Sequence, residues 1–214
     1  MAAGLTCILR RHDHTSGVGV VLRGIAKRGC HPFLYAHPLT RAHSKKIAET
    51  EHLAEQLEIA HGNPLEVAGM LVTPFPTSHD SPGSTCFRFE SGGDAVGFMT
   101  DTGVVTPEAH EALSGVRILA IESNHDVGML KEGPYPPFLK QRILGSEGHL
   151  SNAQCCEEVA SLLHPELEHV IAMHVSDHNN TFDLPAAELE DVLAAHGRGA
   201  SVHVARPDRP IAIS

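Results

Sequence analysis

Short β-rich runs alternate with helical segments along the whole chain, and no internal repeat or low-complexity linker interrupts them. Strands are expected at 5–9, 31–36, 65–99 (several short runs), 117–122, 169–173 and 200–205. Helices are expected at 17–29, 39–60, from 106 onward, 151–163 and 186–195, with one short helix inside the irregular stretch 124–148. This mixture predicts an α/β fold with a substantial antiparallel part, in one domain over residues 1–214.

Histidine is unusually abundant, with 17 in 214 residues and no poly-His tract to explain them. Imidazole is the commonest metal ligand in proteins, so the placement of these residues matters. The formal net charge of −10 indicates that the surface as a whole does not attract nucleic acid. No apolar run is long enough to cross a bilayer, and the N-terminal order of residues is wrong for a secretory signal, so a cytoplasmic protein is expected. The five irregularly spaced cysteines are expected to be reduced.

Four polar clusters follow β-rich runs, where strand ends deliver side chains to a common edge. They are His12-Asp13-His14, Ser78-His79-Asp80, Thr100-Asp101-Thr102-Gly103 and Met173-His174-Val175-Ser176. A single histidine at a strand end is more often a hydrogen-bonded structural residue than a ligand, but four such ends together favour a metal site. A set of three to five His and Asp ligands suits Zn²⁺ or Mn²⁺, and a bridging carboxylate allows one or two ions.

One long block carries a family resemblance. It comprises Glu122-Ser123-Asn124-His125-Asp126, Gly133-Pro134-Tyr135-Pro136, the seven residues LKQRILG at 139–145 and Gly148-His149-Leu150-Ser151-Asn152. The block resembles the metallo-β-lactamase-fold hydrolases of the YycJ/WalJ group, which are related to PhnP and ribonuclease Z. The match extends from about Leu5 to the C-terminus and includes PFPTSHD at 74–80. It implies a metallo-β-lactamase-like αββα sandwich, N-terminally truncated because the family's usual first strands are missing.

The resemblance also implies roles for individual residues. His79 and His174 match metal ligands, and Asp101 matches the carboxylate that bridges two metals and can orient the attacking water. His149 matches a catalytic histidine that acts as a general acid. Ser151 is expected only to cap the following helix, whereas His125 and Asp126 either lie near the site or brace a loop.

The first metal motif of the family, His-x-His-x-Asp-His, is shortened here to Arg11-His12-Asp13-His14, and two alignments are open. Aligned from the left, His12 and His14 join His79 and Asp101 in one complete metal site. Aligned from the right, Asp13 and His14 join Asp101 and His174 in the other site. His14 is a ligand in both cases, and each alignment leaves the second site with two ligands.

These features favour a metal-dependent phosphodiesterase, with an exonuclease acting on nucleic acid ranked first. Lys131, Lys140 and Arg142 form the only basic cluster beside the family block, so phosphate contacts are expected there. The shortened motif motivates the alternative, a catalytically impaired family member that binds only metal or a partner. A thiolesterase or glyoxalase-like hydrolase on the same fold is a third hypothesis, which the nuclease-type block disfavours.

Overall fold

The strands of the chain form two sheets in the computed structural model, which describes residues 6–9 and 17–213. The smaller sheet is parallel, with the order β1-β2-β3. Its strands are β1 (Thr6–Leu9), β2 (Phe33–Ala36) and β3 (Glu55–Glu58). The larger sheet has the order β10-β9-β8-β7-β6-β5-β4, antiparallel from β4 to β7 and parallel from β7 to β10. Its strands are β4 (Leu65–Val67), β5 (Met70–Pro76), β6 (Thr85–Ser91), β7 (Asp94–Met99), β8 (Ile118–Glu122), β9 (His169–Met173) and β10 (Ser201–Val204).

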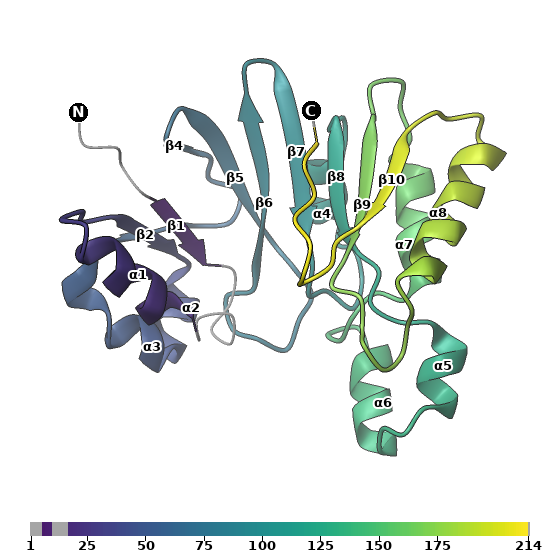
Figure 1. The fold of residues 1–214 in the computed structure, drawn as a ribbon, viewed down its shortest axis with the longest axis horizontal. Helices are drawn as coiled ribbons and strands as arrows, with labels where there is room; N and C mark the ends of the chain where they lie inside the picture. The colour runs from purple at the N-terminus through teal and green to yellow at the C-terminus, as the bar shows by residue number, and fades with distance from the viewer. Residues whose placement is uncertain (1–5, 10–16, 214) are drawn as a thin grey trace.

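Helices cover the outer face of each sheet (Figure 1). Those beside the smaller sheet are α1 (Val18–Ala26), α2 (Pro38–His43) and α3 (Lys45–Ala48). Those on the larger sheet are α4 (Pro107–Leu113), α7 (Asn152–Ser161) and α8 (Asp183–Ala195). Two further helices, α5 (Val127–Glu132) and α6 (Pro137–Leu144), project beyond one end of the larger sheet (Figure 1). The layers are helix, sheet, sheet and helix, so the predicted αββα class is confirmed.

Alternation along the strands explains the two inner layers. In β2, Leu34 and Ala36 pack with α1 and α3, whereas Tyr35 points the other way and packs with Val72 and Phe87 of the larger sheet. Successive side chains of a strand point to opposite faces, so one strand serves two cores. The outer face of the larger sheet packs on α4, α7 and α8 through the buried residues Leu113, Val159, Leu189, Leu119, Ile121, Val170 and Ala172.

The single helix predicted over 39–60 is wrong. Ser44 has an extended backbone that ends α2, and its Oγ accepts a hydrogen bond from the Ile47 amide at 3.3 Å, which starts α3. A 3₁₀ turn, η2 (Glu51–Leu53), then leads into β3, where Leu57 pairs with Tyr35. The spacing of Leu57 and Ile59, two residues, is the period of a strand rather than of a helix. The stretch 124–148 likewise contains two helices, α5 and α6, instead of one.

The remaining elements lie close to their predicted positions. The capping box of α7 is confirmed, because Ser151 Oγ accepts from the Gln154 amide and the Gln154 side chain accepts from the Ser151 amide. Cys30, Cys86, Cys155 and Cys156 are free thiols, as expected. Among the described residues, no helix has the length and apolar character to cross a membrane. The single-domain organisation stays a prediction.

We expect the core under α4 to carry much of the stability. Leu113 is fully buried, so Leu113→Ala removes packed methyl groups and leaves a cavity, which lowers the free energy of unfolding by about 2–5 kcal/mol. The matched control is Leu144→Ala, whose side chain is 44% exposed and whose effect stays within about 0.5 kcal/mol. Urea unfolding of the two variants measures the difference, and equal losses would contradict this assignment of the core.

Candidate metal centre

Four strands deliver side chains to one edge of the larger sheet. β5, β7, β8 and β9 run in the same direction, so their carboxyl ends share that edge. Four candidate side chains come from these ends, and a fifth, His149, comes from the loop between α6 and α7. The four are His79 after β5, Asp101 after β7, Glu122 at the end of β8 and His174 after β9. The convergence that strand ends predict is therefore present for Asp101 and His174, whereas His79 lies outside the cluster.

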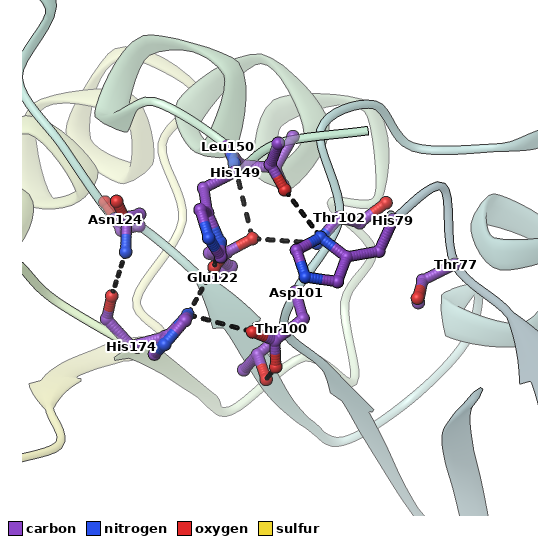
Figure 2. Close-up of polar contacts among 12 residues, drawn as sticks. Thr77, His79, Thr100, Asp101, Thr102, Glu122, Asn124, His149, Leu150 and His174 are labelled. Atoms are coloured by element: carbon purple, nitrogen blue, oxygen red, sulfur yellow. Dashed lines mark hydrogen bonds and ion pairs between the residues drawn. The ribbon is translucent and has the colours of Figure 1, made fainter. Parts of the chain in front are cut away.

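Four of these side chains form a compact cluster. One ligand atom from each of Asp101, Glu122, His149 and His174 lies within 4.8 Å of the other three. His174 Nδ1 is 2.5 Å from Glu122 Oε1 and 3.5 Å from Asp101 Oδ1 (Figure 2). Among the described residues, this is the one group of three or more His, Cys, Asp and Glu side chains close enough to share an ion.

The Glu122 carboxylate lies at the centre of the cluster and is fully buried. Oε1 accepts hydrogen bonds from Nδ1 of His149 at 2.9 Å and from Nδ1 of His174 at 2.5 Å. Oε2 accepts from the backbone amides of Thr102 at 3.0 Å and Leu150 at 3.3 Å. Both oxygens are thus occupied by N–H donors, which is the arrangement that satisfies a buried charge.

These contacts fix the ionisation of Glu122. Burial would raise the pKa of the carboxyl, but the hydrogen bonds from His149 and His174 and the positive charge of the two rings outweigh burial and lower the pKa to about 2. Glu122 accepts the Nδ1–H of each ring. When His149 or His174 is neutral, its lone pair is therefore on Nε2. This carboxylate–histidine pairing is the one that orients metal-binding imidazoles in proteins.

Asp101 and His174 have left-handed backbones, with φ of 61° and 56°. Such a conformation strains a non-glycine residue, and strained residues concentrate at functional sites. Asp101 is fully buried, and its Oδ2 accepts from Thr100 Oγ1 at 3.0 Å. The carbonyl of His174 accepts from Asn124 Nδ2 at 2.7 Å. The surrounding hydrogen bonds therefore hold both residues in the conformation that points them at the cluster.

His79 lies beside the cluster rather than in it. Its Nδ1 donates to the Gly148 carbonyl at 3.0 Å, and its Nε2 is 3.5 Å from Asp80 Oδ1. The centroid of its ring is 5.1 Å from that of His149, which in turn is 5.0 Å from that of His174. The His149 ring therefore lies next to both of the others (Figure 2).

The donor set of the cluster fits a divalent metal ion. Imidazole nitrogens with carboxylate oxygens suit Zn²⁺ and Mn²⁺. Glu122 is already saturated by N–H donors, so its geometry suits the orientation of ligands better than ligation. Asp101 and His174 are the members best placed to bind an ion, with His79 adjacent.

A cleft opens over the three histidine rings and has a volume of about 450 Å³. We call it the histidine cleft; His79, His149 and His174 line it, together with residues of α6 and the segment just before it and residues of the loop after β9. The residues from these two segments are Tyr135, Leu139, Arg142 and Ile143, and Val175, Ser176, Asp177 and Asn179. A substrate in this cleft lies against the rings of His79, His149 and His174, whereas Asp101 is fully buried and does not line the cleft.

The predicted site residues fall into three groups. Asp101, His149 and His174 come together, and His79 lies beside them. His12, Asp13 and His14 lie outside the described residues. Glu122 has no predicted role, although its position signals one, because it is a charged residue that ends the apolar run RILAIE.

The neighbouring residues His125 and Asp126 have different environments. Asp126 caps α5, since its Oδ1 accepts from the Met129 amide at 2.7 Å, and therefore braces a loop. His125 is 1% exposed, and neither of its ring nitrogens has a hydrogen-bond partner among the described residues. Burial lowers the pKa of His125 to about 4, so this ring is neutral at pH 7.

Because the pKa of Glu122 is lowered, the free energy of unfolding should depend on pH in the acidic range. The ordinary value is 4.5 and the folded value is about 2, so the contribution of Glu122 is complete above about pH 4.5 and is lost as the pH falls towards 2. In metal-free protein, Glu122→Gln should reduce the loss of unfolding free energy between pH 5 and pH 2, measured by urea unfolding. Glu190→Gln, at an exposed position of α8, should keep the wild-type pH dependence. Identical pH dependence in all three proteins would contradict the prediction.

Comparison with known proteins places this geometry in a family. A model described as a β-lactamase superfamily domain matches residues 8–175. Exodeoxyribonuclease YycJ of Bacillus anthracis is 28% identical over 221 residues, which cover 99% of this chain and 80% of the relative. Exodeoxyribonuclease WalJ of Streptococcus pneumoniae serotype 2 is 30% identical over 204 residues, which cover 92% of this chain and 74% of the relative.

Solved structures show the same fold. YhfI of Bacillus subtilis, a metallo-β-lactamase fold protein, aligns with a TM-score of 0.68 at 15% identity, over 94% of this chain and 74% of that one. A diphosphatase of the PhnP family aligns with a TM-score of 0.65 at 19% identity, over 94% and 67% of the two chains. The family model matches most of the chain. The chain therefore belongs to the metallo-β-lactamase superfamily, where it is related to the YycJ/WalJ exodeoxyribonucleases.

Proposed function

We propose that this metallo-β-lactamase-fold hydrolase is a metal-dependent exonuclease that cleaves phosphodiester bonds of DNA. The observation that carries the proposal is the buried Glu122 carboxylate, which holds Nδ1 of both His149 and His174 at the bottom of an open cleft. The DNA substrate is inferred from the relatives named as exodeoxyribonucleases, at 28% and 30% identity.

Asp101 and His174, with His79 beside them, are the proposed metal ligands among the described residues. These residues would hold one or two Zn²⁺ or Mn²⁺ ions, which would activate water at neutral pH and stabilise negative charge at phosphorus. Asp101 also has a carboxylate oxygen, Oδ1, on the His174 side, where it can orient the attacking water.

His149 is the proposed general acid. Its Nδ1–H is held by Glu122, so a ring that carries a second proton, on Nε2, can give that proton to the oxygen that leaves phosphorus. Glu122 fixes the orientation of the ring, as an acidic partner does for a catalytic histidine in other hydrolases. Because His149 lines the histidine cleft, this proton faces the space that substrate occupies.

Asp101 is the position whose loss should be most damaging. Changing an outer partner of a metal ligand already reduces metal affinity or activity about 10–100-fold, so Asp101→Ala should reduce Mn²⁺- or Zn²⁺-dependent exonuclease activity by roughly 100-fold or more. Asp191→Ala, at an exposed position of α8, is the control and should keep full activity. Undiminished turnover of Asp101→Ala would show that this residue is structural.

The shortened first motif motivates the second candidate function, a catalytically impaired family member that binds metal or a partner but turns nothing over. Metal content is measured after purification without chelator: two equivalents per chain support a binuclear enzyme, and none supports an impaired member that binds only a partner. His12, Asp13 and His14 belong to this test although they lie outside the described residues.

The same motif yields a prediction with opposite outcomes for its two alignments. If His12 and His14 are the ligands, His12→Ala abolishes metal binding and Asp13→Asn is mild. If Asp13 and His14 are the ligands, the order is reversed. Metal titration of the purified variants measures this, with His14→Ala as the control that must fail. Full metal binding by His14→Ala would contradict both alignments.

A further inference from the structure

One aromatic side chain in the histidine cleft has no part in the chemistry described above. Tyr135 is half-buried, and its ring lines the cleft with Leu139 and Arg142. Tyr135 lies just before α6, and Leu139 and Arg142, which are three positions apart, lie on one face of that helix. Pro134 and Pro136 flank it and restrict the backbone, so holding this ring in place requires little further loss of entropy.

The Tyr135 ring also contacts the loop after β9. His178 meets Tyr135 edge to face, with centroids 5.8 Å apart and planes at 78°. His178 belongs to the loop that begins at His174, and Ser176 Oγ accepts hydrogen bonds from the amides of His178 at 3.4 Å and Asn179 at 3.2 Å. The contact therefore connects α6 with the loop that carries a candidate metal ligand.

The remaining walls suit a nucleotide. Arg142 lines the cleft with its side chain 61% exposed, and its Nε donates to Asp80 Oδ2 at 2.5 Å. Asp177 is the one carboxylate that lines the cleft. A volume of about 450 Å³ lies within the range of roughly 300–1,000 Å³ that holds a single small ligand. One nucleotide is of that size, whereas a stacked duplex end is not.

We propose that Tyr135 is the stacking surface for the base of a terminal, unpaired nucleotide of a DNA strand. The inference rests on the proposed nuclease function and adds where the strand end binds and which state of the end is accepted. Stacking on an aromatic ring is tolerant of sequence because every base has a π face, and it contributes about 1–3 kcal/mol per base. The cleft should therefore accept all four bases and require a paired end to fray first.

The first test measures binding without metal or turnover. Calorimetry compares 2′-deoxyadenosine 5′-monophosphate with 2-deoxyribose 5-phosphate, which lacks the base. Wild-type protein should prefer the nucleotide, and Tyr135→Ala should weaken nucleotide binding by roughly 5- to 150-fold, which corresponds to the stacking energy above, while leaving the sugar phosphate unaffected. Tyr135→Phe keeps the ring and should keep the preference.

Phe138→Ala is the matched control, because Phe138 is an aromatic residue of α6 that is 71% exposed and does not line the cleft. It should bind the nucleotide as the wild type does. A wild type without preference for the nucleotide would overturn the inference, and so would wild-type binding by Tyr135→Ala or an equal loss in Phe138→Ala. Far-UV circular dichroism of Tyr135→Ala checks that this variant is folded. If it is not, the binding of nucleotide and of sugar phosphate is compared between the wild type and Tyr135→Phe.

The second test separates this inference from the proposed function. Single-stranded oligonucleotides with a normal or an abasic terminal nucleotide are digested with Mn²⁺, and Tyr135→Ala should lose activity on the normal end only. If the wild type digests no DNA but binds the nucleotide through Tyr135, the nuclease proposal fails and the stacking site stands. If DNA is digested and Tyr135→Ala treats both ends as the wild type does, the stacking site is wrong and the nuclease proposal stands.

Discussion

A fully buried carboxylate with four N–H partners organises the sheet edge of this protein. Glu122 ends β8 and accepts hydrogen bonds from the loop after β7, from the loop before α7 and from the residue after β9. Removing an ion from water costs several kcal/mol, and charge-assisted hydrogen bonds to both oxygens offset that cost. The three loops that carry Asp101, His149 and His174 are therefore fixed relative to one another by a single side chain.

The same edge tolerates unfavourable backbone geometry because its loops are packed against each other. Asp101 and His174 are left-handed, a conformation that costs about 1–3 kcal/mol each when a larger residue adopts it. A Cβ on Gly103 would collide with the backbone at Gly145, and one on Gly148 would collide with the Ile143 carbonyl. Glycine at 103 lets the loop after β7 approach the loop after α6 in backbone contact, and glycine at 148 lets the loop after α6 fold back on the end of that helix.

The positions of most strands and the location of the site follow from patterns that the sequence displays directly. Period-two runs predict the strands of the larger sheet, and polar residues after them predict Asp101 and His174 at one edge. The resemblance adds His149, which no strand pattern indicates. Glu122 escapes prediction because its role depends on contacts with residues 27 and 52 positions away. The helix predicted over 39–60 fails for a related reason: β3 forms by pairing with β2, a tertiary interaction that a short charged sequence does not reveal.

The charge balance of the chain bears on how such a site meets a polyanion. With 26 acidic and 16 basic residues, the protein as a whole repels DNA, and salt screens that repulsion beyond roughly 8–10 Å. Of the three predicted phosphate contacts, Arg142 pairs with Asp80, and the two lysines, Lys131 and Lys140, are too few to track a long backbone. A protein with few phosphate contacts loses little affinity as salt rises. On the proposed function, affinity therefore comes from short-range contacts at the metal centre and at the base rather than from extended electrostatic attraction. Contacts of that range favour the end of a strand, which can enter a cleft, over the continuous duplex, which cannot.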